Sequence, residues 1–213
     1  MKHIAASAIP MGARVVFCAI FVLLSGCALP LPDKPVRPAA YDLGPPLAMP
    51  AAAPGVALGF DRVEAPTAID TNAIVYRLLY AGGSQQPRPY AHARWSMAPA
   101  QLVGQRLRAA LAASHPVLDA GNTLAVLQLS AELDEFAQVF TTPEASEGVV
   151  RLRVTAIAPQ ARQGRLLGQR SFVQRVAAPT PDAAGGAQAL REATDAVLRE
   201  VVDWVNALPT SRS

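Results

Sequence analysis

The sequence is poor in the residues from which catalytic and metal sites are built. It contains two cysteines and three histidines in 213 residues. No two of them stand at metal-ligand spacing, and no Gly-x-Ser-x-Gly elbow, Gly-x-x-x-x-Gly-Lys phosphate loop or Gly-x-Gly-x-x-Gly fingerprint is present. These absences argue against a zinc enzyme, a serine hydrolase and a nucleotide-binding protein. We therefore predict a protein with no catalytic residues, no metal and no cofactor.

Long apolar runs are also scarce, and the clearest one lies near the N-terminus. Residues 15–24 read VVFCAIFVLL and follow the basic residues Lys2 and Arg14. Ten apolar residues are too few to cross a bilayer, which needs about 20. The run ends in Leu24, Ser25, Gly26 and Cys27, which have the form of a lipobox. Residues 1–26 are therefore predicted to be a cleaved lipoprotein signal peptide, with a diacylglyceryl group on Cys27. The alternative is an ordinary secretory signal with Cys27 present by chance.

Cleavage before Cys27 changes the charge and thiol content of the chain. Cys18 is lost and Cys27 is consumed by lipid, so no disulfide within the chain is expected. The removed segment holds two basic residues and no acid, so the net charge falls from +3 to +1. No basic block remains that would indicate nucleic-acid binding. The lipid places the protein on a membrane surface, where stable anchoring takes two or more acyl chains.

A proline-rich segment follows the predicted anchor. Residues 28–54 contain eight prolines, and proline removes backbone donors and fixes φ. Residues 27–54 are therefore predicted to be a lipid anchor and a semi-extended Pro/Ala-rich tether that makes no core contacts. Two alternatives remain open: a short edge strand at Tyr41–Leu43, or disorder throughout.

Residues 55–208 have the length and patterning of one folded domain, and residues 209–213 form a short tail. Period-two alternation and turn signals predict strands at 55–64, 73–80, 90–95, 123–134, 149–158 and 166–176. Helical spacing predicts amphipathic helices at 97–114, with Gln101, Gln105, Arg106 and Arg108 on the polar face, and at 187–208. Asp182 is placed to cap the second helix. The expected fold class is α+β: a single two-layer domain with a mainly antiparallel or mixed sheet packed against the two helices.

Two groups of polar side chains are candidates for a catalytic site. Glu132, Asp134 and Glu135 suggest paired acids for sugar hydrolysis, but the strand pattern favours the solvated side of a strand and its end. His115 stands at a helix end before Pro116, where a cation or a polar group is expected in any case.

Aromatic residues and arginines cluster within twenty positions. The group comprises Tyr76, Arg77, Tyr80, Arg88, Tyr90, Arg94 and Trp95. Tyr, Trp and Arg are enriched where one protein binds another, so Arg77, Tyr80, Tyr90 and Trp95 are predicted to form a partner interface. In the alternative interpretation the tyrosines pack on one strand face and the arginines are solvated.

The same residues carry a resemblance to a known family. The runs Tyr76–Tyr80 (YRLLY) and Tyr90–Trp95 (YAHARW), then Pro99 and a helix over 101–111, resemble the ABC-type transport auxiliary lipoproteins, which include the paraquat-inducible protein C lipoproteins. Supporting pieces are the lipobox, Tyr41–Leu43, Val63–Pro66 and Trp204. The long tether departs from the family pattern.

The resemblance implies a role in the cell envelope. Such lipoproteins work with mammalian-cell-entry (MCE) domain proteins, an ABC permease and an ATPase that move lipids or other hydrophobic molecules between membranes. The family member is non-catalytic, docks the periplasmic end of the transporter, and sometimes forms a homo-oligomer. Ala28 directly follows the cysteine, as in lipoproteins that are released to the outer membrane. The resemblance therefore predicts an anchor in the periplasmic face of the outer membrane; anchoring in the inner membrane stays open. The alternative functions are a lipid-binding shuttle or chaperone, and a small periplasmic hydrolase.

Overall fold

The computed structural model describes residues 37–50, 54–159 and 164–209. The predicted signal peptide, with Leu24, Ser25, Gly26 and Cys27, lies outside the described residues. Within the described ranges, no helix has both the length and the apolar character needed to cross a membrane.

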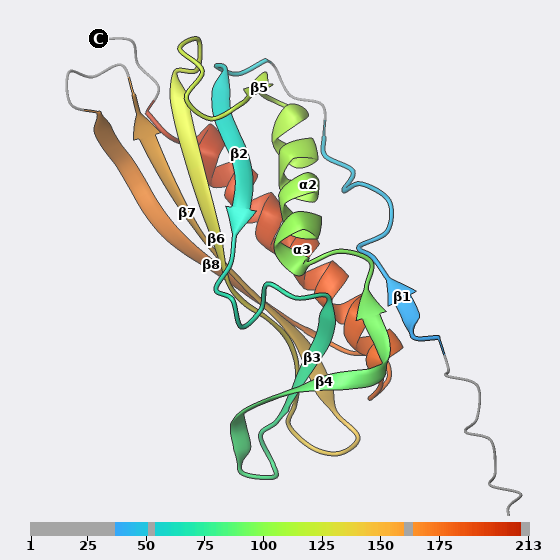
Figure 1. The fold of residues 1–213 in the computed structure, drawn as a ribbon. Helices are drawn as coiled ribbons and strands as arrows, with labels where there is room; N and C mark the ends of the chain where they lie inside the picture. The colour runs from blue at the N-terminus through green and yellow to red at the C-terminus, as the bar shows by residue number, and fades with distance from the viewer. Residues whose placement is uncertain (1–36, 51–53, 160–163, 210–213) are drawn as a thin grey trace, which may run out of the picture. The chain divides into compact units, whose positions relative to one another are not determined.

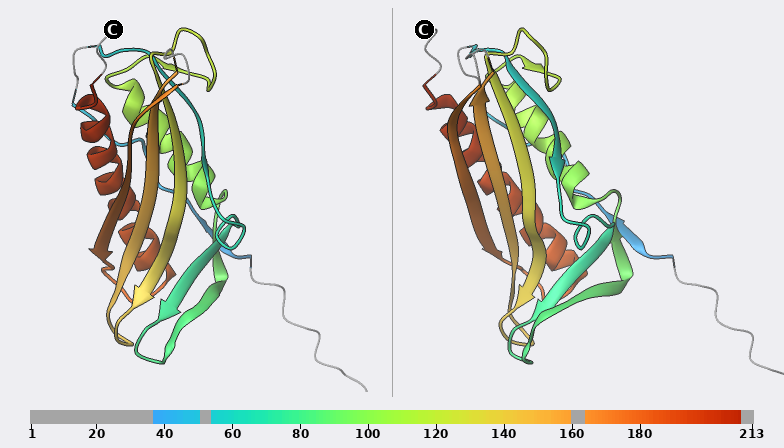
Figure 2. Two further views of the ribbon diagram at one scale, coloured as in Figure 1. Left: turned by 90° about the vertical axis from the view of Figure 1, so that its left-hand side faces the viewer. Right: turned by 60° about the vertical axis from the view of Figure 1, so that its left-hand side comes forward.

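The described residues form one eight-stranded mixed sheet with two helices on one of its faces (Figure 1). The elements in chain order are β1 (Ala39–Tyr41), β2 (Leu58–Glu64), β3 (Ala73–Leu78), β4 (Gly83–Trp95), α2 (Pro99–Ala112), β5 (Val117–Leu118), β6 (Leu127–Phe140), β7 (Ser146–Ala158), β8 (Arg165–Ala177) and α3 (Ala183–Asn206). Seen with the sheet in front, both helices lie behind it (Figure 2). The predicted α+β fold with two helices is confirmed.

Strand β6 is the centre of the sheet. Along one edge it pairs with β7, antiparallel and over nearly its whole length, and β8 continues that antiparallel meander. Its other edge is shared: β2 pairs in parallel with the first half of β6, and β3 pairs in parallel with residues 138–140. Beyond β3 lie β4 and β1, and beyond β2 lies β5. The parallel pairs make the sheet mixed, and they let the β3–β4 hairpin diverge from β2 at one end of the sheet.

The core lies between the sheet and the helices, as the alternation predicts. The inward residues of β6 and β7 are buried: Leu127, Leu129, Ala131, Leu133, Val150, Leu152, Val154 and Ala156. α3 lies so close to β7 that a Cβ on Gly148 would stand 2.6 Å from the backbone of Ala189 and Leu190. Asp182 caps α3 as predicted, accepting a hydrogen bond from the Gly185 N–H at 2.8 Å, and this bond lowers the pKa of the carboxyl.

Strands β6 and β4 extend furthest beyond the ranges that the sequence pattern predicts. β6 continues six residues past Asp134, because a register shift between Leu133 and Glu135 interrupts the period-two signal there. β4 begins at Gly83 although it contains Pro87 and Pro89. On the edge of β4 that faces away from β3, only the last three residues pair with another strand, β1. Proline lacks an N–H, but along the rest of this edge no strand pairing requires one.

The segment at residues 37–50 corrects the tether prediction. β1 pairs in parallel with the end of β4, and Leu43 is 3% exposed within the main core. The Pro45 carbonyl accepts a hydrogen bond from Arg106 at 2.6 Å. A prediction of no core contacts through residue 54 is therefore wrong for this segment, and the folded unit begins at Arg37. Proline is compatible with these contacts because it keeps its carbonyl and because β1 contains none.

Candidate functional site

The β3–β4 hairpin carries the predicted aromatic cluster at one end of the sheet (Figure 1). The Tyr76 ring packs against Tyr90, with 4.7 Å between centroids, and against Phe140 on β6 at 5.9 Å. These contacts fix the base of the hairpin against the central strand. The tip of the hairpin therefore extends from a base that is packed against β6.

Tyr90 also links the base of the hairpin to β6 and β7 through a chain of hydrogen bonds. Its hydroxyl donates to Gln138 Oε1 at 2.8 Å, and Gln138 Nε2 donates to Ser146 Oγ at 2.7 Å. Gln138 is fully buried, so the two bonds satisfy an amide that would otherwise be costly. Burial, with a smaller contribution from neighbouring Tyr76, raises the pKa of Tyr90 to about 12. Tyr90 is a structural link between β4, β6 and β7.

Tyr90→Phe is expected to flatten the alkaline loss of stability. The unfolded tyrosine releases its proton near pH 10, whereas the folded one holds it to about pH 12. The stabilising contribution is therefore complete below pH 10 and is lost as pH rises through 12. The variant also removes a hydrogen bond from buried Gln138, at a cost of about 1–3 kcal/mol. Urea unfolding from neutral pH to pH 12 measures both effects; Tyr80→Phe is the exposed control, and an equal alkaline loss in all three proteins contradicts the prediction.

Trp95 does not belong to an interface. Its side chain is 1% exposed and packs edge-on against Phe136 with 5.4 Å between ring centroids. The prediction that Trp95 contacts a partner is therefore wrong, because β1 and the helix layer enclose the end of β4. Arg77 and Tyr90 are half-buried, and Arg77 stands beside Val139 in the parallel ladder.

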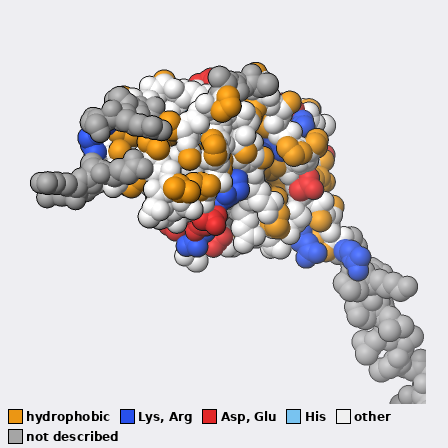
Figure 3. All heavy atoms as spheres, turned by 90° about the horizontal axis from the view of Figure 1, so that it is seen from above, with side chains coloured by type: hydrophobic (Ala, Val, Ile, Leu, Met, Phe, Trp, Pro, Cys, Tyr) orange, Lys and Arg blue, Asp and Glu red, His pale blue; other side chains and the backbone are white. Residues whose placement is uncertain are grey.

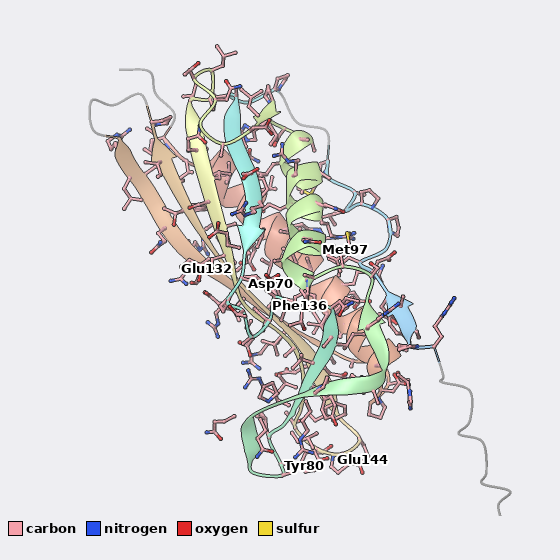
Figure 4. All side chains as sticks on the ribbon, in the orientation of Figure 1. Asp70, Tyr80, Met97, Glu132, Phe136 and Glu144 are labelled. Carbon is pink, nitrogen blue, oxygen red and sulfur yellow. The ribbon has the colours of Figure 1, made fainter. Side chains whose placement is uncertain are left out.

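The exposed part of the hairpin is its tip. Tyr80 is 48% exposed and Leu79 is 44% exposed. The Leu79 N–H donates to the Phe140 carbonyl at 2.9 Å, which holds the tip beside the β6–β7 turn. Tyr80 and Glu144 of that turn both lie at this end of the sheet (Figure 4). Leu79 is not among the interface residues predicted from the sequence. A Leu-Tyr pair just before a Gly-Gly turn is a signal that could have placed it at an exposed hairpin tip.

The charge of the hairpin has one sign. No Asp or Glu occurs between Asp70 and Asp119, whereas Arg77, Arg88 and Arg94 all lie on β3 and β4. Arg88 and Arg94 are exposed. We use the name hairpin tip for Leu79 and Tyr80 together with Arg88, a cation on β4 whose register partner on β3 is Tyr76. This combination is typical of protein-binding surfaces.

The opposite end of the sheet also exposes apolar side chains. Leu124 is exposed before β6, and Ile157 and Leu166 are cross-strand partners on β7 and β8. Seen from that end, the apolar side chains form separate patches among polar atoms (Figure 3). These residues provide matched surface controls for the hairpin tip.

The acidic residues on β6 are engaged in cross-strand ion pairs. Arg153 contacts Glu132 at 3.0 Å and Asp134 at 2.8 Å, and Arg151 contacts Glu135 at 3.6 Å. They belong to the sheet face away from the helices, where a hollow of about 350 Å³ is lined mostly by polar and charged side chains. The arrangement is that of a solvated strand face. In the part of the chain that the structure describes, no group of three or more acidic, His or Cys side chains is arranged to hold a metal ion.

His115 has a structural role. It is 8% exposed, its Nδ1 lies 3.0 Å from the Val56 carbonyl and its Nε2 lies 2.8 Å from Asn206 Oδ1. The ring therefore joins the segment before β2 to the end of α3.

Solved structures share this fold. A crystal structure of an uncharacterized protein matches with a TM-score of 0.62 and 13% identity, covering 79% of this chain and 99% of that one. Protein XCC0632 from Xanthomonas campestris, assigned to the family DUF330, matches with a TM-score of 0.60 and 16% identity, covering 79% and 92%. At these identities the similarity shows the fold alone.

The sequence comparisons are more specific. No curated protein matches the chain. A family model described as "ABC-type transport auxiliary lipoprotein component" matches residues 41–202, which include every element from β2 to the last turns of α3. The match confirms the resemblance carried by the YRLLY and YAHARW runs.

Proposed function

The chain belongs to the family of ABC-type transport auxiliary lipoprotein components, and from this premise we propose that it is a non-catalytic docking subunit of an MCE-type transporter. In this role Cys27 carries the lipid that anchors the protein to the periplasmic face of the outer membrane. The transporter moves lipids or other hydrophobic molecules across the cell envelope. The auxiliary subunit supplies a binding surface for its periplasmic part.

The hairpin tip is the observation that carries the docking role. It combines exposed Leu79 and Tyr80 with Arg88, on a hairpin without acidic residues. The Tyr76–Tyr90–Phe140 packing and the Leu79–Phe140 hydrogen bond hold it in place. A preorganised tip loses little side-chain and loop entropy when a partner binds, so its few contacts yield more affinity.

Docking is favoured over a lipid-binding shuttle. A shuttle needs an apolar groove, whereas α2 and α3 bury their apolar faces directly against the sheet. The hollow on the opposite face is bordered by Asp61, Arg62, Glu64, Glu132 and Arg153. Charged walls of this kind suit water and ions better than acyl chains. Native mass spectrometry that shows a phospholipid bound to the protein would favour the shuttle.

Co-purification from detergent extracts tests the proposal. The lipidated wild-type protein is expected to recover an MCE-domain protein. The Leu79→Ser, Tyr80→Ala double variant should recover at least about tenfold less, the scale of one interface hot spot. Both substitutions change exposed side chains, so the melting temperature of the double variant should stay within a few degrees of the wild type.

Two controls separate docking from membrane co-localisation. Leu124→Ser removes a leucine at the other end of the sheet that is more exposed than Leu79, 74% against 44%, and should leave recovery unchanged. Cys27→Ala should move the protein to the soluble fraction with its folded domain intact. Equal recovery of the MCE-domain protein by wild type and the double variant would refute the hairpin tip as the docking surface.

A further inference from the structure

Strand β8 forms an open edge of the sheet. It pairs with β7 alone among the strands of the described residues. Its register with β7 is shifted once, at Leu167, and then runs without interruption from Gly168 to Ala177. Alternate residues of such a strand direct their N–H and C=O groups away from the sheet. Gly168–Ala177 is therefore a ten-residue platform, here called the β8 platform, on which another strand can pair.

The fold does little to blunt this edge. The β8 platform contains no proline, and its bulge lies before it rather than within it. α3 packs on the face of β8, through Trp204 against Phe172 at 5.8 Å, rather than along its edge. Long, regular and unblocked edge strands are templates for pairing with another chain.

The charges of the edge select the partner. No Asp or Glu occurs between Glu147 and Asp182. The carboxylate that α3 brings to the platform, Glu200, accepts a hydrogen bond from Gln174. Arg175 is paired with Glu147 across the sheet, but Arg170 is exposed and lies over the Phe172 ring at 4.9 Å, with no carboxylate partner among the described residues. Opposite charges directly across a strand pair are stabilising, and like charges are destabilising.

A second copy of this chain is a poor occupant. When two β8 platforms pair antiparallel in full overlap, Arg170 of each copy faces Arg175 of the other. The free edge of β4 carries arginines and no acids as well. Segments of the same chain fit no better: residues 28–36 contain Pro30, Pro32 and Pro35, and residues 210–213 read TSRS.

We propose that the β8 platform binds an extended acidic segment of a partner protein, which adds to the sheet as a ninth strand. Main-chain hydrogen bonds supply affinity, and carboxylates opposite Arg170 supply selectivity. This site is separate from the hairpin tip and does not depend on the docking role proposed for it. Loss of one is therefore distinguishable from loss of the other, because Leu79 and Tyr80 variants leave β8 unchanged.

Hydrogen–deuterium exchange of the full-length lipidated protein in micelles tests this inference. The probes are end-blocked peptides of about ten residues that match the platform in length: one alternates valine with glutamate, the other valine with lysine. The glutamate peptide is expected to slow exchange of the outward β8 amides at least about tenfold at saturation, as burial in a ladder does. The lysine peptide should leave exchange unchanged.

Charge variants sharpen the test. Arg170→Glu should abolish protection by the glutamate peptide and create protection by the lysine peptide. Arg199→Glu, which makes the same charge change on an exposed site of α3, should behave as wild type. Unchanged exchange in β6 verifies that each variant is folded. No protection by the glutamate peptide, equal protection by both peptides, or β8 protection that rises with protein concentration alone would each overturn the inference, the last by identifying a second copy as the occupant.

Discussion

Trp95→Ala is expected to lower the free energy of unfolding by about 3–5 kcal/mol, the usual cost of truncating a fully packed tryptophan. The ring is 1% exposed and packs against Phe136. Its backbone N–H donates to the Asn72 carbonyl at 2.7 Å, and Tyr41 of β1 is its register partner. The substitution therefore opens a cavity where β1, β4 and β6 meet. Urea unfolding followed by circular dichroism measures the loss.

Tyr80→Ala is the matched control for Trp95→Ala. Both remove an aromatic side chain from the same hairpin region, but Tyr80 is half-exposed and its loss should change stability by no more than about 0.5 kcal/mol. Any effect of Trp95→Ala on partner capture would then follow from unfolding. Equal destabilisation by the two variants would contradict the assignment of Trp95 to the core.

Asp195→Ala is expected to destabilise the protein by a similar amount, about 3–5 kcal/mol, because it leaves a buried cation without its partner. Arg106 is 7% exposed and forms a two-point ion pair with Asp195, Nε to Oδ1 at 2.5 Å and Nη2 to Oδ2 at 3.0 Å. Its Nη1 donates to the Pro45 carbonyl. One guanidinium thus joins α2, α3 and the segment after β1.

A double-mutant cycle separates the net contribution of the Arg106–Asp195 ion pair to stability from the cost of leaving Arg106 buried without its partner. Arg106→Met combined with Asp195→Ala replaces both charges by apolar side chains and should recover much of the stability lost in Asp195→Ala alone. The variants without Arg106 should also show faster exchange at residues 43–46, since the clasp on that segment is lost. A double variant less stable than either single variant would contradict this account.

Local patterns in the sequence determined both helices, the longer strands and their inward faces, but not the short strands β1 and β5. A half-buried strand or helix must repeat its apolar residues at its own period. The buried faces of β6, β7 and α3 could therefore be predicted from the alternation at Leu127–Leu133 and Val150–Ala156 and from the apolar stripe on α3. Asp182 was found for the same reason: a cap interacts with backbone three residues away. Family membership followed from short runs on β3 and β4.

Tertiary structure alone decided which side chains reach solvent. Arg106 was predicted on the polar face of its helix, yet Asp195 and Pro45, 89 and 61 residues away in sequence, bury it. Trp95 and Tyr80 look alike as interface residues, but β1 covers the first, whereas the second stays 48% exposed. The open edge of β8 likewise depends on which strands pair. Burial is set by long-range contacts, which a local pattern does not encode.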